Sequence, residues 1–200
     1  MTEEQLISDV CRRASNPATQ TDYSKIRVRE VGPPATSQSI EATERRLGFS
    51  LYRLHCRLLK TVGNGGFGPG DGLIGTADGS LDVDGRSLCE LKEAFWPDTE
   101  VALVPLCDWG DGIWSCLDTA TGCVVSCSEF GLFSTGQTLH SWLEKWVAGD
   151  NLWLEMVVPG TTIVQNPSTS EYVTVATVQG MKGDPYILPA RDGNDGPHHT

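Results

Sequence analysis

The fold class depends on one stretch of the chain, VALVPLCDWGDGIWSCLDTATGCVVS at residues 101–126. Three short runs rich in Val, Leu, Ile and Cys alternate there with the turn sequences DWGDG and DTATG. Such runs, bounded by Gly and Asp, are typical of strands, and turns this short join antiparallel neighbours because parallel strands need a long crossover. The stretch therefore predicts a three-stranded antiparallel meander.

Helical patterns lie on both sides of the meander, and a second β pattern follows them. The helical segments are 2–14, 37–48, 51–62, 88–95 and 138–149, and further strands are expected at 73–76, 161–164 and 172–179. Consecutive strands flanked by helices form an α+β pattern and not alternating βαβ units. We predict an α+β fold with a central, mainly antiparallel sheet flanked by helices, and with a C-terminal β-hairpin extension.

The chain divides by composition into four parts. A helix and a polar connector occupy 1–36 and end at Pro33 and Pro34, a pair that marks a boundary. The main domain is expected over 37–152 and a C-terminal extension over 153–188. The tail over 189–200 has few apolar residues and is expected to be disordered.

Charge is distributed unevenly along the chain. The 200 residues carry a net charge of -11, and residues 61–137 hold two Lys/Arg against twelve Asp/Glu, a net of -10. A surface of this sign repels nucleic acid and anionic lipid, since binding a phosphate backbone requires Lys and Arg. It attracts a cationic partner, although acidic loops also serve solubility alone. We therefore expect no direct binding to nucleic acid or membrane.

The N-terminus and the cysteines indicate a compartment. Glu3 and Glu4 stand where a secretory signal would carry positive charge, and no apolar run is long enough to cross a bilayer. The seven cysteines are an odd number without a secretory context, so free thiols are expected. These features predict a cytoplasmic protein.

A glycine-rich stretch raises the question of phosphate binding. TVGNGGFGPGDG at residues 61–72 contains a G-x-G-x-x-G at Gly63, Gly65 and Gly68. A dinucleotide loop follows a strand and opens a helix, because free amides at the helix N-terminus bind the phosphate. Here the order is reversed, since a predicted helix ends at Gly63. We therefore expect a helix C-terminus that runs into tight turns, and no nucleotide cofactor.

Metal and catalytic motifs are incomplete. The segment ADGSLDVDGRSLCE, residues 77–90, lacks the carboxylate that closes a calcium loop, because Glu90 falls one residue short. The four cysteines between residues 107 and 127 lack the C-x-x-C pairs of structural zinc sites. Ser134 in GLFSTG misses the spacing of a G-x-S-x-G nucleophile elbow. We expect no metal site and no cofactor, and an enzyme is the minority interpretation at this point, with a Cys-His nucleophile pair left open.

Several segments, taken in order, resemble one family. The chain resembles the SUKH superfamily in four motifs and in their order. These are IEATERRLG at 40–48, NGG at 64–66, DWGDG with a later Leu-Asp, and WLEKW at 142–146. That family includes fungal cell-wall synthesis regulators of the Smi/Knr type and many bacterial immunity proteins. The resemblance covers about residues 37–152, and Tyr52 stands where the family often has proline. The matching motif residues are Asn64, Gly65, Gly66, Gly110, Gly112, Trp142 and Trp146.

The resemblance implies no catalytic residues, and it implies a function as well as a fold. Bacterial members are commonly antidotes that bind and block a toxin domain, often a nuclease. A nuclease is cationic where it grips its substrate, so an antidote that presents carboxylates is attracted to it. We therefore expect an immunity protein that neutralises a cognate toxin through an acidic surface, with one tryptophan as an aromatic anchor. The expected partner-binding residues are Asp82, Asp84, Asp108, Trp109, Asp111 and Asp118.

Other interpretations remain open. Aspartates beside glycines favour turns by bonding their own backbone, and Trp109 can equally point into the core; Trp142 and Trp146 are expected to be core residues. A non-enzymatic adaptor of the Smi/Knr type has the same sequence features as an immunity protein. The third interpretation is an uncharacterised hydrolase, whose candidate residues are Cys56, His55, Ser134 and His140.

Overall fold

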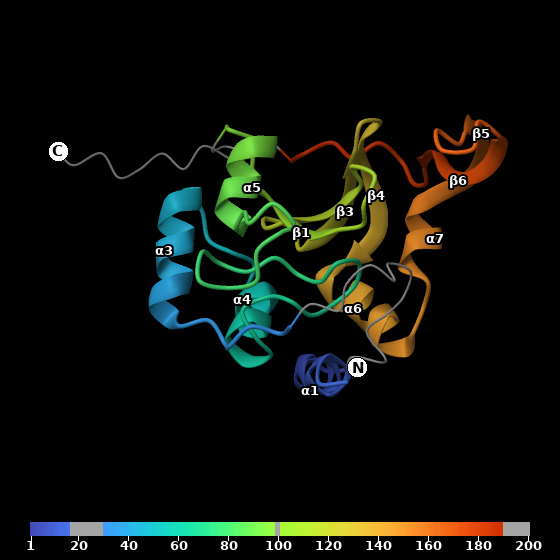
Figure 1. The fold of residues 1–200 in the computed structure, drawn as a ribbon. Coiled ribbons are helices and arrows are strands. Elements are labelled where there is room, and N and C mark those ends of the chain that lie inside the picture. Colours follow the sequence, from blue (N-terminus) through green and yellow to red (C-terminus); the bar gives the residue numbers. More distant parts are fainter. Residues whose placement is uncertain (17–29, 99–100, 190–200) are drawn as a thin grey trace.

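The fold is known from a computed structural model that describes residues 1–16, 30–98 and 101–189. Its helices are α1 (Glu3–Ala14), α3 (Ser37–Leu47), α4 (Arg53–Thr61), α5 (Leu88–Phe95), α6 (Leu139–Ala148) and α7 (Leu152–Met156). Its strands are β1 (Leu103–Asp108), β2 (Trp114–Asp118), β3 (Cys123–Ser128), β4 (Gly131–Thr138), β5 (Val157–Gln165) and β6 (Tyr172–Met181). The predicted α+β class is confirmed: helices flank an antiparallel sheet, and a two-stranded hairpin follows it (Figure 1).

The central sheet has four strands in the order β1-β2-β3-β4, and every neighbouring pair is antiparallel. Three of these strands were predicted, whereas β4 was not. Its register against β3 shifts between Val124 and Val125, because Thr135 and Gly136 form a bulge there. Gly136 has a φ of 68°, a conformation that residues with a Cβ rarely adopt.

Both edges of this sheet are covered by other segments of the chain. Beside β1, the amides of Asp71 and Ile74 donate to the carbonyls of Asp108 and Leu106, each at 2.8 Å. The strand predicted at 73–76 is therefore an irregular segment that bonds to β1 without forming a regular ladder. Beside β4, residues 184–186 form a strap: Ser134 N donates to Asp184 O, and Tyr186 N donates to the carbonyl of Leu132, each at 2.8 Å. Covered edges do not pair with other proteins.

Helices pack on the sheet and on one another. Helix α6 lies against β3 and β4, α5 lies against β1, and α1 and α4 pack on α6 (Figure 1). Helix α6 begins at the predicted cap, where the Thr138 hydroxyl accepts from Ser141 N, and ends at Gly149 with a φ of 89°. Trp142 and Trp146 are fully buried, which confirms them as core residues. The buried side chains of α1 join the same core.

The glycine-rich segment begins where α4 ends, in the predicted order of helix and then turns. Asn64 is buried and organises it: its Oδ1 accepts from Thr76 N at 3.0 Å, and its Nδ2 donates to Thr76 Oγ1 at 2.7 Å. Gly65 and Gly66 have φ values of 84° and 82°. The three motif residues therefore fold a tight junction between α4 and the sheet.

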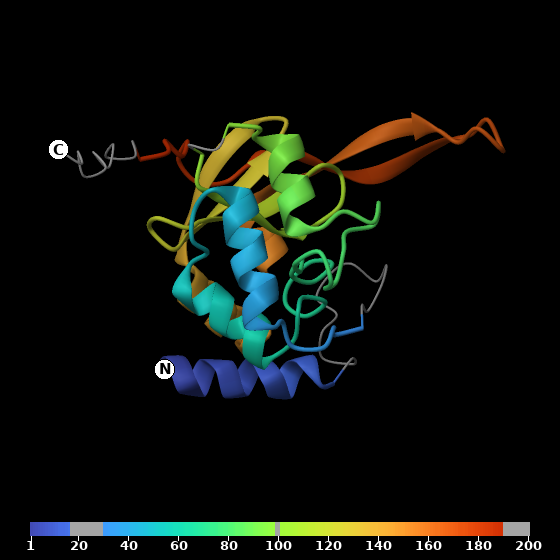
Figure 2. The ribbon, with the colours of Figure 1, turned by 90° about the vertical axis from the view of Figure 1, so that its left-hand side faces the viewer.

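The hairpin β5–β6, which we call the arm (residues 157–181), extends away from the rest of the molecule, which we call the body (Figure 2). Its strands are longer than predicted. Its base is held by Val157, which is fully buried, and by the partly buried Val178 and Met181. The predicted disordered tail lies, from residue 190 onward, outside the described residues, as does 17–29 of the predicted connector.

Candidate functional site

Four aspartates and one arginine gather beside the edge of β1, and we call this group the acidic patch. Its members are Asp71, Asp82, Asp84, Arg86 and Asp108. The segment 71–74 brings Asp71 to β1, because its amide donates to the carbonyl of Asp108. Arg86 contacts Asp82 and Asp84 at 2.8 and 2.9 Å. Its pKa is raised, first by the hydrogen bond to Asp82 and further by the nearby negative charges of Asp84 and Asp108.

The turn that carries Asp82 and Asp84 gives the two carboxylates different roles. Asp82 has a fully buried side chain, and its Oδ1 accepts from the amides of Arg86 and Asp84 at 2.6 and 3.0 Å. It therefore closes the turn, in the way that aspartate bonds its own backbone. Asp84 keeps 67% of its side chain exposed. Only Asp84 of this pair faces solvent for a partner.

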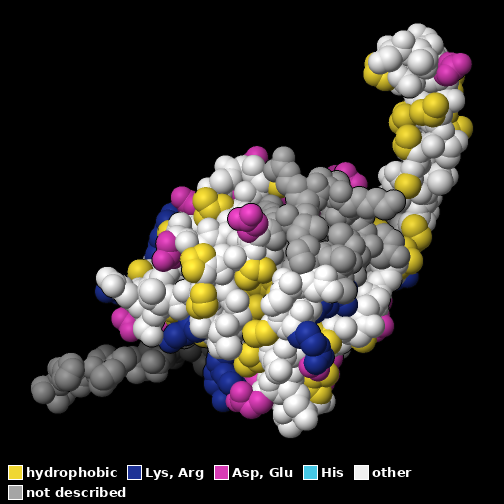
Figure 3. All heavy atoms as spheres, turned by 60° about the horizontal axis from the view of Figure 1, so that its bottom comes forward, with side chains coloured by type: hydrophobic (Ala, Val, Ile, Leu, Met, Phe, Trp, Pro, Cys, Tyr) yellow, Lys and Arg dark blue, Asp and Glu magenta, His cyan; other side chains and the backbone are white. Residues whose placement is uncertain are grey.

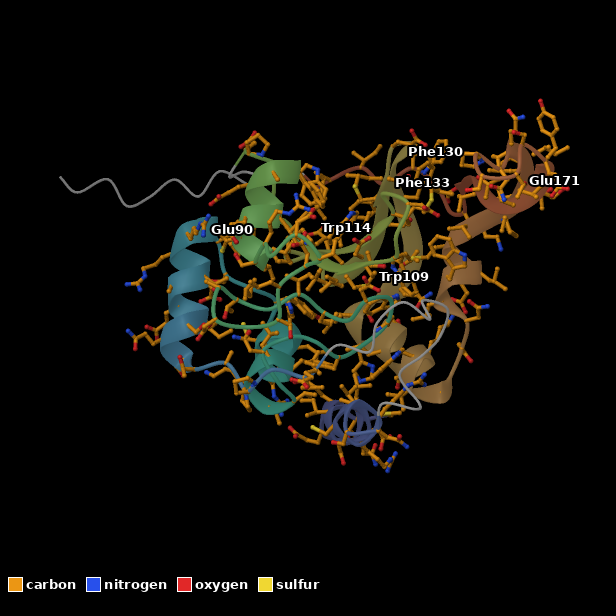
Figure 4. The ribbon with its side chains drawn as sticks, in the orientation of Figure 1. Glu90, Trp109, Trp114, Phe130, Phe133 and Glu171 are labelled. Atoms are coloured by element: carbon orange, nitrogen blue, oxygen red, sulfur yellow. The ribbon has the colours of Figure 1, made fainter. Side chains whose placement is uncertain are left out.

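The loop between β1 and β2 turns Asp111 toward solvent and Trp109 toward the core, although both were expected to contact a partner. Asp108 Oδ1 accepts from Gly110 N at 2.8 Å, and Asp111 is exposed with a φ of 52°. Trp109 instead turns inward, as Figure 4 shows, and its Nε1 donates to Ser115 Oγ at 2.9 Å. Its ring lies 6.1 Å from that of Trp153, and only 9% of the residue is exposed. The expectation of an exposed aromatic anchor is therefore wrong for Trp109, which belongs to the core.

Asp118 lies at the opposite end of β2 from the acidic patch and is 1% exposed. Its Oδ1 accepts from Ala120 N at 2.9 Å, and its Oδ2 accepts from the Tyr186 hydroxyl at 2.6 Å. The pKa of Tyr186 is raised, first by burial and then by this carboxylate. Asp118 thus fixes the strap to the sheet, and the structure does not present it to a partner.

The two positive side chains of residues 61–137 are both engaged. Arg86 is paired with aspartates, as described above. Lys92 is 2% exposed, and its ammonium donates to the carbonyls of Trp96 (2.5 Å) and Asp98. Neither cation is therefore displayed to solvent as a free charge, whereas Asp84 and Asp111 of the same stretch are exposed carboxylates.

The hydrolase candidates are not assembled into a site. Within the described residues, no hydrogen bond joins any two of Cys56, His55, Ser134 and His140. His55 is fully buried, neither ring nitrogen has a partner in the described part, and burial lowers its pKa to about 4. Burial also raises the pKa of the Cys56 thiol to about 11. A thiol with that pKa is protonated at neutral pH and is a weak nucleophile.

One hollow of about 470 Å³ lies between α3 and residues 77–78. The Asp78 carboxylate on its wall accepts from the hydroxyls of Ser39 and Thr76, each at 2.5 Å, and these bonds lower its pKa. The polar groups here are satisfied by one another, which is typical of a structural network. Among residues 1–16, 30–98 and 101–189, no three His, Cys, Asp or Glu side chains gather to hold a metal ion.

The chain matches no model of a known protein family, no curated protein and no solved structure. The resemblance to the SUKH superfamily therefore stays a prediction from motifs. In the described part of the chain, every helix is too short or too polar to span a bilayer.

Sequence reasoning overlooked two surface features. Asp71 was not singled out, because only the fold brings it beside Asp108. The arm exposes Ile163 and Tyr172, which are 68% and 74% exposed, and hydrophobic side chains lie along its length (Figure 3). The signal in the sequence was a β-branched hairpin with a single charged residue, Glu171.

Proposed function

We propose that this chain is a SUKH-type immunity protein that acts in the cytoplasm by binding a cognate toxin, a cationic nuclease domain. The contact surface is the acidic patch together with the adjoining loop 109–113. The observation that carries the proposal is the net charge of -10 over residues 61–137, combined with the engagement of both cations in that region. Asp84 and Asp111 are its most exposed carboxylates.

Two physical arguments support this surface. Clustered negative charge raises the rate at which a cationic protein is captured, and the effect weakens with salt. Carboxylates held on short, hydrogen-bonded turns lose little conformational entropy when they bind. Asp84 and Asp111 sit on such turns, because Asp82 and Asp108 bond the backbone beside them. The patch therefore presents its charges on a preformed surface.

The motif residues of the resemblance also fit the proposal. Asn64, Gly65 and Gly66 form the junction between helix and sheet, and Trp142 and Trp146 fill the core. These are structural roles, so the motif preserves the fold and leaves the acidic loops free to suit one toxin. Among the described residues, the hydrolase candidates Cys56, His55, Ser134 and His140 form no comparable arrangement of side chains.

The test is co-expression with the product of the gene next to this one. We expect that product to stop growth when expressed alone, and growth to be restored when this chain is present. A neighbouring product that binds this chain without being toxic would favour the adaptor interpretation. A neighbour that is neither toxic nor bound would overturn both.

A pair of double variants tests the surface itself. Asp84→Asn with Asp111→Asn removes two exposed charges from the proposed surface, while Glu41→Gln with Asp150→Asn removes two exposed charges elsewhere. Exposed charge pairs contribute up to about 1 kcal/mol each, so the first variant should slow association with the toxin about tenfold at low salt. The control should slow it less than about twofold. Equal effects would place the contact outside the patch.

A further inference from the structure

The arm differs from the central sheet in how its edges are treated. Both edges of the sheet are covered, by residues 71–74 and by the strap. In the described residues, the outer edges of β5 and β6 receive no hydrogen bond from another element between residues 158 and 180. Uncovered edges are normally protected by Lys, by proline or by a short strand. The arm has long strands and no lysine between residues 157 and 181.

The arm is almost uncharged although it belongs to an acidic protein. Glu171 at its outer end is its one charged residue (Figure 4). Apolar residues line both faces, because directly opposed residues such as Val164 and Val173 share one face while Ile163 lies on the other. An isolated two-stranded ribbon is marginal in water, and three or more strands are needed for independent stability. This composition therefore suits an arm that gains further strands from a partner.

The two edges of the arm are not equivalent. Strand β5 contains Pro159, which has no N–H to donate, and its register shifts between Val158 and Pro159. Strand β6 runs for 10 residues without proline or charge. The β6 edge is therefore the one able to form a continuous ladder.

We propose that the β6 edge pairs with the β6 edge of a second copy of this chain, antiparallel about a two-fold axis at Ala176. The two arms then form one four-stranded sheet. In this register Tyr172 lies opposite Gly180 of the second copy. A Cβ added at Gly180 would meet nothing within 4 Å, so this glycine leaves open space on the strand. An aromatic side chain across from a strand glycine covers the backbone that the glycine exposes.

Charge favours a second copy over another occupant. Two chains of net charge -11 repel each other, so identical chains meet best through a segment that carries almost no charge. In the proposed register the two Glu171 side chains lie at opposite ends of the joined strands and do not face each other. A cationic partner, by contrast, would gain no attraction from an uncharged arm. The inference is therefore independent of the proposed toxin.

The size of the contact sets its strength. Ten residues at about 3.3 Å each give a joined edge about 33 Å long, and a ribbon about 10 Å wide then buries on the order of several hundred Å². Stable complexes bury at least about 1,200 Å² in total. We therefore expect a weak dimer that dissociates on dilution, with a Kd in the micromolar range.

The first experiment is sedimentation velocity on the full chain from about 1 to 300 µM under reducing conditions. The weight-average mass should rise from that of the 21.7 kDa monomer toward twice that value. Thr174→Lys should raise the Kd of the dimer at least tenfold, because each of the two chains then places one positive charge on the joined edge. Ala42→Lys, at an exposed position of α3, makes the same change of charge away from the arm and should not weaken the dimer. A monomer at every concentration would overturn the proposal and leave the arm to a different partner.

The second experiment locates the edge by crosslinking. Ala176→Cys places two thiols at the axis, within reach of a disulfide. Thr161→Cys is the matched control, since Thr161 lies directly opposite Ala176 within the same arm but on β5. After mild oxidation, the Ala176→Cys chain should yield several-fold more covalent dimer than either the control or the unchanged protein. Equal or greater crosslinking through Thr161→Cys would refute pairing along β6.

Discussion

Replacement of Gly65 by alanine should destabilise the protein far more than its backbone angle alone explains. Gly65 has a φ of 84°, and an added Cβ would lie 2.6 Å from the carbonyl oxygen of Leu73 and 2.7 Å from the amide nitrogen of Gly75. Both neighbours are backbone atoms held in the junction, because Gly66 N donates to Leu73 O and Gly75 N donates to Ser80 O. They cannot move aside as a flexible side chain would.

Two contributions determine how much Gly65→Ala lowers the free energy of unfolding. A residue with a Cβ in the left-handed region costs about 1–2 kcal/mol, and overpacking costs a further 1–3 kcal/mol. Gly85→Ala is the control, since Gly85 has a similar φ of 79° but nothing within 4 Å of the added Cβ. The gain from a stiffer unfolded chain, about 0.4–1 kcal/mol, is common to both variants and cancels. Gly65→Ala should therefore lose about 2 kcal/mol more than Gly85→Ala.

Urea unfolding followed by circular dichroism measures the difference. With a slope of about 2 kcal/mol per M, the midpoint of Gly65→Ala should lie about 1 M below that of Gly85→Ala. Midpoints within about 0.3 M of each other would show that the close approach of Gly65 to the 73–75 backbone contributes nothing. The junction would then tolerate any small residue.

Two further predictions concern buried polar groups. Burial lowers the pKa of His55 to about 4, against about 6.5 in an unfolded chain. Protons therefore bind preferentially to the unfolded state, so the free energy of unfolding falls by up to about 3 kcal/mol as the pH drops from about 6.5 to 4. His55→Leu should remove this part of the pH dependence, which urea midpoints of the unchanged protein and the variant at pH 7.5 and 4.5 measure. If the two proteins lose the same stability between these pH values, His55 is not the cause. Tyr186→Phe removes the hydroxyl that donates to Asp118 and should cost about 1 kcal/mol, with faster hydrogen exchange at the Ser134 amide beneath the strap. Tyr172→Phe on the arm is its control, and unchanged exchange at Ser134 in Tyr186→Phe would mean that the strap is held by its backbone alone.

Local signals accounted for most of the helices and three of the four sheet strands. Thr138 and Gly149 bound α6 through caps that involve only near neighbours, which is why the sequence was sufficient to place that helix. Strand β4 was missed because Gly131, Gly136 and its polar residues favour no strand by themselves. Its conformation depends on pairing with β3, and the bulge at Gly136 hides the alternation that would have indicated it.

The roles of the candidate contact residues could not be predicted in the same way. Asp111 and Asp118 stand in similar Gly-containing turns, yet one is exposed and the other is buried. The difference arises from Tyr186, a partner 68 positions away in the sequence. Trp109 is likewise turned inward by contacts with Ser115 and Trp153. Packing between residues far apart in the sequence therefore decides which aspartates are exposed to solvent. Local sequence patterns do not reveal these distant contacts.

The two covers of the central sheet are synthesised at different times. Residues 71–74 leave the ribosome before β1, whereas Asp184 of the strap follows the end of β4 at Thr138 by 46 residues. At about 5–20 residues per second, β4 therefore waits roughly 2–9 s for its cover during translation. In that interval the nascent chain already has all four strands but still offers an open edge to neighbouring polypeptides. A chain terminated before residue 184 would keep that edge open permanently, although it retains every helix and strand of the body.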